Sequence, residues 1–163
     1  LPVLREFDTR LVMDNRIECD IPEYKEFISL IDKKKIPYHH TVAGEHFKID
    51  KFTEVIILNP GDNNKKIIDD NDFNNNSIVL KLCYKDSSFL FTGDIEKEAE
   101  DVLLNYGDIL QADVLKIPHH GSKTSSTKPF LEKIKPEVVV ISSRYKSRFG
   151  FPHPSVLKRY QAI

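Results

Sequence analysis

The sequence has no excess of charge of either sign, few cysteines and no long apolar run. Lys and Arg total 24 against 25 Asp and Glu, so the net charge of -1 does not indicate a basic nucleic-acid-binding protein, although it allows a local basic patch. The apolar runs are far shorter than the ~20 residues that a membrane-spanning helix needs. No signal peptide is evident, because Leu1-Pro2-Val3 offers neither an initiating Met nor an apolar core. We therefore expect Leu1 to be an excision point within a longer protein.

The two cysteines, Cys19 and Cys83, have no metal-binding spacing. Cys83 lies in the apolar run 78–84 and is predicted to be a small core residue, while a disulfide between the two remains an alternative. With 163 residues, 40% of them hydrophobic, the chain has the size and composition of one globular domain over residues 1–163.

The pattern along the chain predicts an α/β protein, since strands come first and then alternate with helices. The stretch 39–50 is interpreted as a hairpin or a pair of short strands, and 62–76, rich in Asn, Asp and Lys, as a solvated loop. Other strands are expected at 11–13, 54–58, 77–84, 88–91, 112–117 and 137–141, with a hairpin turn at 85–86, and helices at 22–35, 96–104, 127–134 and 154–160.

The first chemical cluster is Thr92-Gly93-Asp94, directly after the strand 88–91. A carboxylate at a strand tip, held by a glycine turn, is a good ligand for a divalent metal. Asp is also a preferred helix N-cap residue, and on this cluster alone capping is the favoured interpretation.

The second cluster is Pro118-His119-His120-Gly121-Ser122, after the strand 112–117. Adjacent histidines in a tight turn project in different directions, so one can bind a metal while the other faces a substrate. A pair of exposed loop histidines is the alternative. The hydroxyl-rich stretch 122–126 that follows suits an anion, and it contains Ser122, Ser125 and Ser126.

The third cluster is the segment 150–154, which contains His153 between two prolines and follows Arg144, Lys146 and Arg148. It could present a histidine and cations to a phosphate, but a rigid turn entering the last helix is slightly favoured. The other histidines, His39, His40 and His46, are predicted to lie on the surface.

Taken together, these clusters resemble the hydrolase-like domain of ComEC-type competence proteins, which are membrane proteins of DNA uptake. The resemblance is carried by four segments in order: Phe91-Thr92-Gly93-Asp94, the run ADVLKIPHHGS over 112–122, Ser125-Ser126 and Pro152-His153-Pro154. It extends over nearly the whole chain and implies an αββα metallo-β-lactamase sandwich with two divalent metal ions, Zn²⁺ or Mn²⁺.

The resemblance also implies roles for individual residues. Asp94 would bridge the two metals, His120 is preferred as a metal ligand, and His119 would face the substrate. Which of the two histidines binds the metal stays open. Ser122, Ser125, Ser126 and His153 are the predicted substrate-binding residues.

Two departures from the family pattern limit what we expect of this chain. The family's His-x-His-x-Asp-His motif is absent, and Phe151 stands where the family often has a histidine. The sandwich is therefore expected to be incomplete on its N-terminal side, metal-poor and inactive as an isolated chain, with an exposed sheet that can self-associate.

For the intact domain, the leading hypothesis is metal-dependent hydrolysis of a phosphodiester, with single-stranded DNA as the partner, on the extracytoplasmic side of a membrane protein. One alternative is a stand-alone secreted enzyme that acts on lipid or cell-wall phosphodiesters. The other is a non-catalytic binding module.

Overall fold

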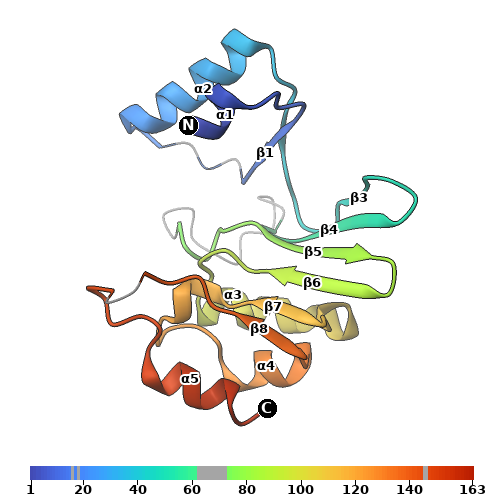
Figure 1. Cartoon of the computed structure of the whole chain (residues 1–163), viewed down its shortest axis with the longest axis vertical. Helices are drawn as coiled ribbons and strands as arrows, with labels where there is room; N and C mark the ends of the chain where they lie inside the picture. The colour runs from blue at the N-terminus through green and yellow to red at the C-terminus, as the bar shows by residue number, and fades with distance from the viewer. Residues whose placement is uncertain (16, 18, 62–72, 145–146) are drawn as a thin grey trace. The chain divides into compact units, whose positions relative to one another are not determined.

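The computed structural model describes residues 1–15, 17, 19–61, 73–144 and 147–163. By its internal contacts the chain divides into two compact units, Leu1–Thr41 and Val42–Ile163, which run from blue to red along the chain in Figure 1. The single domain expected over 1–163 stays a prediction. Within the described ranges, no helix has the length and apolar character needed to cross a membrane.

The first unit is built around a β-α-β arrangement. Its elements are α1 (Pro2–Glu6), β1 (Val12–Asp14), α2 (Pro22–Lys34) and β2 (Tyr38–His40). The strands β1 and β2 pair in parallel, and α2 is the crossover between them. Leu4, Ile31 and Ile36 form the buried core. The helix predicted over 22–35 is confirmed, and it ends where Lys35 takes a left-handed conformation with φ 52°.

The second unit contains a mixed six-stranded sheet in the order β3-β4-β5-β6-β7-β8. The pairs from β3 to β6 are antiparallel, whereas β6–β7 and β7–β8 are parallel. The turn at 85–86 joins β5 to β6 as predicted. The strands are β3 (His46–Lys48), β4 (Thr53–Asn59), β5 (Val79–Tyr84), β6 (Ser87–Phe91), β7 (Val114–Lys116) and β8 (Val138–Val140).

Helices cover one face of this sheet. Leu90 of β6 and Leu115 of β7 are fully buried against them, together with Phe130 of α4. Because successive side chains of a strand point to opposite faces, these contacts define the core side. The helical elements are α3 (Lys97–Leu103), the 3₁₀ segments η2 (Leu104–Leu110) and η3 (Pro118–Gly121), α4 (Lys128–Ile134) and α5 (Pro154–Tyr160).

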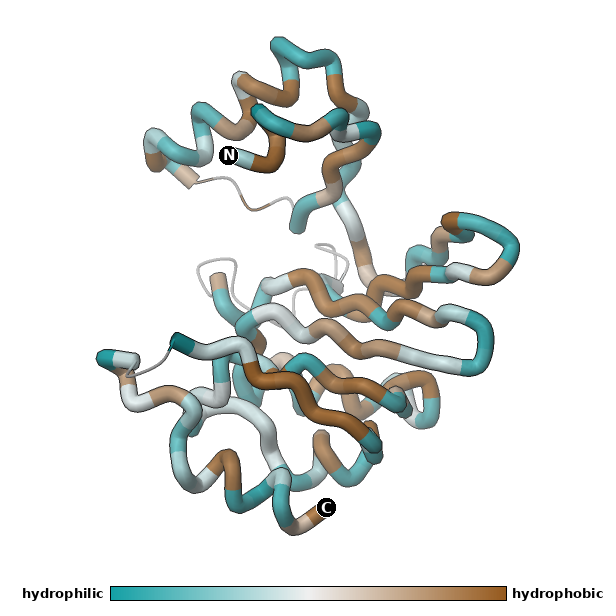
Figure 2. Tube along the Cα trace, viewed as in Figure 1, coloured by the Kyte–Doolittle hydropathy of each residue, from teal (hydrophilic) through white to brown (hydrophobic). Residues whose placement is uncertain are grey.

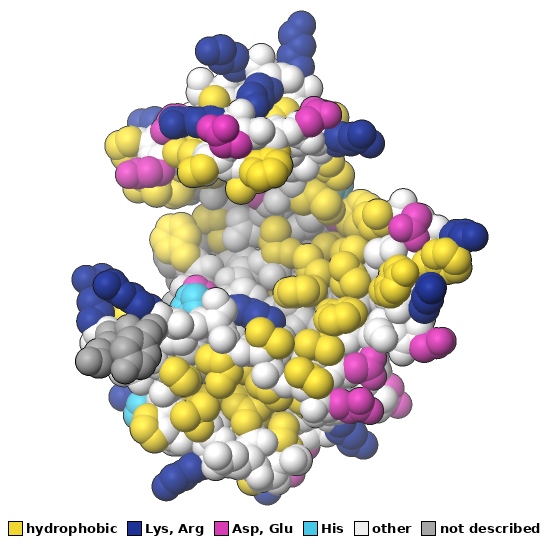
Figure 3. All heavy atoms as spheres, in the orientation of Figure 1, with side chains coloured by type: hydrophobic (Ala, Val, Ile, Leu, Met, Phe, Trp, Pro, Cys, Tyr) yellow, Lys and Arg dark blue, Asp and Glu magenta, His cyan; other side chains and the backbone are white. Residues whose placement is uncertain are grey.

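The opposite face of the sheet is apolar and exposed, as the brown strands of Figure 2 and the hydrophobic side chains of Figure 3 show. Phe91, Val138 and Val140 expose 42%, 52% and 47% of their surface. The strand register places the following side chains on this open face: Leu80, Leu82, Phe89, Phe91, Val114, Lys116, Val138 and Val140.

Of the two interpretations of 39–50, the pair of short strands is confirmed and the hairpin is not, because β2 pairs with β1 while β3 pairs with β4. Two other sequence interpretations need correction. Cys83 is only half-buried, and it and Cys19 are both free thiols. Asp94 is not the N-cap of α3, which is Glu96. Most of the loop expected over 62–76, at 62–72, and Lys146 lie outside the described residues.

Candidate functional site

Two of the three predicted clusters meet because β6 and β7 run in parallel. Their carboxyl ends lie at the same edge of the sheet, where open α/β sheets place functional groups. The buried Thr92 hydroxyl donates to the Lys116 carbonyl at 2.8 Å. In addition, the His119 amide donates to the Gly93 carbonyl at 3.2 Å. These bonds hold the loop after β6 against the loop after β7.

Gly93 is required at its position for two reasons. Its φ of +56° lies in the left-handed region, and a Cβ built on it would meet the Ser77 Cβ at 2.5 Å. Ser77 in turn accepts a hydrogen bond from the Asp94 amide at 3.1 Å. This close approach therefore fixes the backbone from which the Asp94 carboxylate projects.

We predict that Gly93→Ala lowers the free energy of unfolding by about 2–4 kcal/mol, because backbone strain and a steric clash add together. Gly150→Ala is the matched control, since its φ of +69° is also positive but no atom lies within 4 Å of the added Cβ. That control should cost only about 1 kcal/mol. Urea unfolding measures both variants, and equal losses would show that the contact with Ser77 has no energetic role.

The Asp94 carboxylate is partly exposed and faces two basic side chains. Its Oδ1 lies 3.6 Å from His120 Nε2 and 3.9 Å from Lys116 Nζ. Burial lowers the pKa of Lys116 from its ordinary value, and the charge of Asp94 partly opposes that effect. The Lys116 ammonium also donates to the Gly93 carbonyl at 3.0 Å. The Asp94 carboxylate thus faces His120 and Lys116, and the N-cap position of α3 is occupied by Glu96.

His120 is oriented as a metal-binding histidine usually is. Its Nδ1 lies 2.6 Å from the Ser142 carbonyl oxygen, so Nδ1 carries the proton and donates it there. The lone pair is then on Nε2, the nitrogen that faces Asp94. One nitrogen and one carboxylate oxygen consequently point into the same space.

His119 is more buried and is held by an acidic partner. Its Nδ1 lies 3.0 Å from Glu96 Oε1, a separation that becomes an ion pair when the imidazole is protonated. In the neutral ring, this buried nitrogen has no well-aligned hydrogen-bond partner among the residues that the structure describes. Glu96 Oε1 also accepts a hydrogen bond from the Thr124 hydroxyl at 2.9 Å. The ring of Phe151 packs edge-on against His119, with centroids 5.6 Å apart.

Both histidines have positive φ angles, 47° for His119 and 53° for His120. Such backbone costs on the order of 1–3 kcal/mol for each residue that is not glycine, and it tends to occur at functional sites. Gly121 follows with φ +84° and lies so close to Pro152 that a Cβ would reach it at 2.7 Å. The two imidazoles contact different partners, Glu96 for His119 and the Ser142 carbonyl for His120.

The two imidazoles open into a cavity of about 550 Å³. Arg148 lies over the ring of Phe149 at 4.8 Å, and the Phe149 and Phe151 rings stack at 5.8 Å between centroids. Cations and flat aromatic faces thus lie beside the histidine pair. The residues that line the cavity are His119, His120, Ser142, Ser143, Arg144, Ser147, Arg148, Phe149 and Phe151.

The four predicted substrate-binding residues do not line this cavity. The Ser125 hydroxyl donates to backbone carbonyls, and that of Ser126 bonds to the Tyr160 hydroxyl at 2.9 Å. The Ser122 hydroxyl pairs with Thr124 at 2.8 Å. His153 is the N-cap of α5, where its Nδ1 accepts from the Ser155 amide. The turn-and-helix interpretation of that segment therefore describes its local structure, and the substrate role of these four residues stays a prediction.

Sequence reasoning assigned no role to Glu96, Lys116, Ser142 and Phe149. Glu96 and Lys116 stand two residues from Asp94 and three from His119, so proximity in sequence was an available signal. Ser142 contributes only its carbonyl oxygen, which no side-chain pattern can indicate. Phe149 reaches the site because the segment 147–151 folds back over the histidine pair.

The donor chemistry at this edge fits a divalent metal ion, although only part of a ligand set is present. Asp94 would supply a carboxylate oxygen and His120 a neutral imidazole nitrogen, which are two of the usual zinc and manganese donors. Among the described ranges, no group of three or more His, Cys, Asp or Glu side chains is placed to hold a metal. Two donors alone do not complete a ligand set, so the metal-binding role of Asp94 and His120 stays a prediction.

Comparison with known proteins confirms the resemblance expected from the sequence. Residues 72–143 match the family model of the Metallo-beta-lactamase superfamily. The chain is 40% identical over 88 residues to ComE operon protein 3 of Bacillus subtilis, and 38% identical over 99 residues to competence protein ComA of Neisseria gonorrhoeae. These matches cover 54% and 60% of the chain but only 11% and 14% of the relatives. Recombination protein 2 of Haemophilus influenzae is 37% identical over 86 residues, which are 53% of the chain and 11% of that protein.

Proposed function

We propose, from the match of residues 72–143 to the metallo-β-lactamase superfamily and from the similarity to competence proteins, that the chain is part of a metal-dependent phosphodiesterase that cleaves DNA during uptake. The observation that carries the proposal is the pairing of Asp94 Oδ1 with His120 Nε2, 3.6 Å apart at the carboxyl ends of two parallel strands. The names of the relatives support the competence setting, and the superfamily supports hydrolysis.

Asp94 and His120 would hold the metal. A bound divalent ion supplies an activated water and neutralises charge on the phosphoryl oxygens. The protein's part is to fix the two ligands: the Ser142 carbonyl fixes the tautomer of His120, and the Ser77 hydroxyl fixes the backbone of Asp94. Positioning of this kind is what second-shell partners contribute in metal sites.

His119 would face the phosphate. When the ring is protonated, the 3.0 Å contact with Glu96 becomes an ion pair, and the imidazolium can donate a proton or a hydrogen bond to a phosphate oxygen. Lys116, whose ammonium lies near Asp94, adds a second positive group at the same edge. Both groups stabilise negative charge that develops on the phosphate as it is attacked.

The cavity beside the histidines favours a nucleic-acid phosphodiester over a lipid or cell-wall phosphodiester. Arg144 and Arg148 have no ion-pair partner among the residues described, so both are free to contact phosphates. The stacked rings of Phe149 and Phe151 offer a flat apolar surface for an unpaired base. A single strand supplies both a phosphate and an accessible base face.

We predict that Phe149→Ala raises the KM for a single-stranded oligonucleotide by about tenfold, because stacking of one base contributes about 1–3 kcal/mol. The kcat should change little, since Phe149 contacts neither Asp94 nor the metal. Methyl p-nitrophenyl phosphate, which has no base, is the comparison substrate. A KM for the oligonucleotide within twofold of the original would contradict the stacking role.

The direct test of the proposed function is hydrolysis by the complete gene product that contains residues 1–163. A 5′-labelled oligonucleotide is incubated with Mn²⁺ or Zn²⁺, with and without EDTA, and the products are separated on a gel. We expect cleavage that EDTA abolishes. Cleavage of a lipid-linked phosphodiester but not of DNA would favour the secreted hydrolase, and failure on both would favour the non-catalytic module.

The partners and location follow from the same proposal. We place the chain on the extracytoplasmic side of a membrane-embedded parent, where incoming DNA would meet it. The open face is the surface that an αββα sandwich packs against its second sheet, so we also propose that chain 1–163 by itself self-associates there. Two divalent ions, Zn²⁺ or Mn²⁺, would occupy the intact domain, and the isolated chain would be metal-poor and inactive.

We predict that Val138→Lys reduces self-association of chain 1–163, because a charge on the open face opposes its desolvation. Val138 is 52% exposed on that face. Ile109→Lys is the matched control, since Ile109 is 48% exposed but lies in η2, among the elements on the opposite side of the sheet. Sedimentation velocity over a range of concentrations measures the shift from oligomer to monomer. A monomeric unsubstituted chain at all concentrations would refute the idea.

A further inference from the structure

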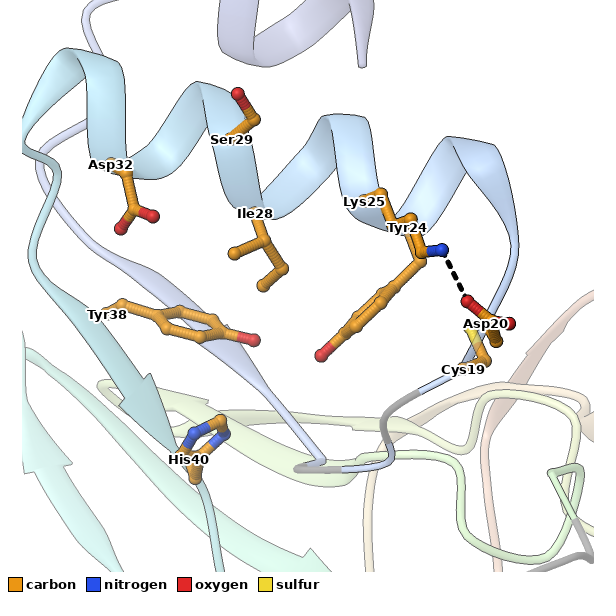
Figure 4. A pocket seen from close by; sticks show the side chains of 9 residues that line it. All are labelled: Cys19, Asp20, Tyr24, Lys25, Ile28, Ser29, Asp32, Tyr38 and His40. Carbon is orange, nitrogen blue, oxygen red and sulfur yellow. Dashed lines mark ion pairs between the residues drawn. The ribbon is translucent and has the colours of Figure 1, made fainter.

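We infer that the first unit carries a binding site of its own for a small organic ammonium ion, in the cavity between α2 and β2 that Figure 4 shows. The cavity measures about 790 Å³ and shares no residue with the cavity around the histidine pair. It is lined by Cys19, Asp20, Tyr24, Lys25, Ile28, Ser29, Asp32, Tyr38 and His40.

Two tyrosines and an isoleucine give the cavity its apolar and aromatic walls. Tyr24 and Ile28 lie one turn apart on α2, and Tyr38 faces them from β2 with its hydroxyl directed toward that of Tyr24 (Figure 4). Aromatic faces attract cations through the ring quadrupole, and the rings and Ile28 also accept an apolar body. An ammonium ion with a small hydrocarbon group matches both properties.

Asp32 supplies the anionic anchor. Its carboxylate has no ion-pair or hydrogen-bond partner among the described residues. It also lies in the last turn of α2, where the helix dipole disfavours an anion and a bound cation would be stabilised. The ammonium of Lys34 does not pair with the Asp32 carboxylate, because it donates to the backbone carbonyls of Leu4 and Arg5.

His40 supplies a fixed hydrogen-bond acceptor. Its Nδ1 lies 2.6 Å from Asp14 Oδ1, so in the neutral ring that nitrogen donates and Nε2 keeps its lone pair. Asp14 also accepts a hydrogen bond from the Tyr38 hydroxyl. Burial and this bond raise the pKa of Tyr38, so the tyrosine remains a neutral hydroxyl. The ring of Tyr38 packs edge-on against His40 at 4.8 Å and limits its rotation.

The remaining charges favour a cation over an anion. Lys25 is paired with Asp20 at 2.5 Å, so these two side chains neutralise each other. Among the described residues that line the cavity, Asp32 is then the carboxylate without an ion-pair partner. A phosphate or carboxylate ligand would be repelled by it, whereas an ammonium ion would be attracted.

The test is isothermal titration of chain 1–163 with benzylamine, and with benzyl alcohol and benzoate as the neutral and anionic counterparts. Benzylamine is expected to bind at least about tenfold more tightly than benzyl alcohol, because a hydrogen bond to a charged group is stronger than one between neutral groups. Asp32→Asn should weaken benzylamine binding about tenfold. Asp8→Asn, which removes an exposed carboxylate of the first unit that does not line the cavity, should change it less than about twofold.

Equal binding of benzylamine and benzyl alcohol, tighter binding of benzoate, or equal effects of the two Asp variants would each overturn the inference. Circular dichroism checks that both variants are folded. If Asp32→Asn fails to fold, the comparison of the three ligands on the unsubstituted chain still decides. The result is independent of DNA cleavage, since no residue of this cavity takes part in the proposed phosphodiesterase site.

Discussion

Glu100→Ala is expected to lower the free energy of unfolding by about 3–5 kcal/mol, the largest effect on stability that we predict for a single side chain. Glu100 of α3 is fully buried. Its carboxylate accepts hydrogen bonds from the amides of Ser126 and Thr127, at 2.5 and 2.8 Å. Those amides stand at the start of α4, whose N-cap residue Thr127 makes no side-chain cap of its own. Alanine would leave both donors buried and unpaired.

Urea unfolding of chain 1–163 measures this effect. Glu132→Ala is the control, because Glu132 is exposed and pairs with Lys128 at 3.5 Å only at the surface. It should cost less than about 0.5 kcal/mol. A loss below 1 kcal/mol for Glu100→Ala would mean that the two amides find other partners.

The pH dependence of stability gives a second test of Glu100. Burial raises the pKa of this carboxyl above its ordinary value, against the opposing effect of the hydrogen bonds from Thr127 and Ser126 and of the charge of Arg159. The folded chain therefore holds the proton more tightly than the unfolded chain. The stabilisation that comes from this tighter proton binding is fully present below the ordinary glutamate pKa and is lost as pH rises through the raised pKa. The free energy of unfolding then falls by at most about 1.4 kcal/mol per pH unit. Glu100→Gln should abolish that slope.

Glu100 also explains why one part of the site prediction has no support from the geometry. In sequence, the stretch 122–126 looks like an anion-binding loop, because hydroxyls follow a histidine pair and a glycine. In the structure its polar groups are used internally. Ser126 bonds to Tyr160, and Arg159 donates to the carbonyls of Ser125 and Ser126. Glu100 lies about 20 residues before this stretch and Arg159 more than 30 residues after it, so only folding brings them to the loop.

The metal-ligand geometry was more accessible to sequence reasoning because it depends on local structure. A strand followed by Thr92-Gly93-Asp94 and a strand followed by His119-His120 place polar groups at strand ends whatever the tertiary context. Once β6 and β7 pair in parallel, those ends must meet. By contrast, the partners of β2 and β3 were unpredictable from 39–50, because strand pairing depends on distant segments. Apolar runs predicted the strands β4 to β8 of the second sheet, whereas β3 was expected only within the hairpin or pair of short strands over 39–50, and the runs could not tell which face stays open.

The structure gives each of the two adjacent histidines a different hydrogen-bonding or charged partner. Sequence offers two adjacent imidazoles with no way to rank them. The Nδ1 of His120 lies 2.6 Å from the Ser142 carbonyl oxygen, and the Nδ1 of His119 lies 3.0 Å from Glu96 Oε1. A ligating histidine donates its other ring N–H to a carboxylate or to a carbonyl, so both histidines have a suitable partner, and the assignment of His120 as the ligand stays a prediction.

Asp94→Asn in the complete gene product is expected to lower kcat/KM for a single-stranded oligonucleotide by on the order of 10³-fold. The reason is that loss of a metal ligand would remove the metal's stabilisation of the transition-state charge, which is several kcal/mol. The asparagine keeps the backbone hydrogen bond to Ser77, and the carboxylate makes only the long contacts to His120 and Lys116. Stability without metal should therefore change by less than about 1 kcal/mol. Bound zinc, measured by elemental analysis after dialysis, should fall in parallel with activity.

Asp101→Asn is the matched control for this substitution. Asp101 is an exposed carboxylate of α3, paired with Lys97 at 2.6 Å, and it lies outside the candidate site. Its loss should leave kcat/KM and zinc content within twofold of the original values. If Asp94→Asn kept activity within tenfold while binding normal zinc, the metal would have to be held by other residues. The meeting of the two strand ends would then have a purely structural purpose, and the proposed function would have to rest on a different site.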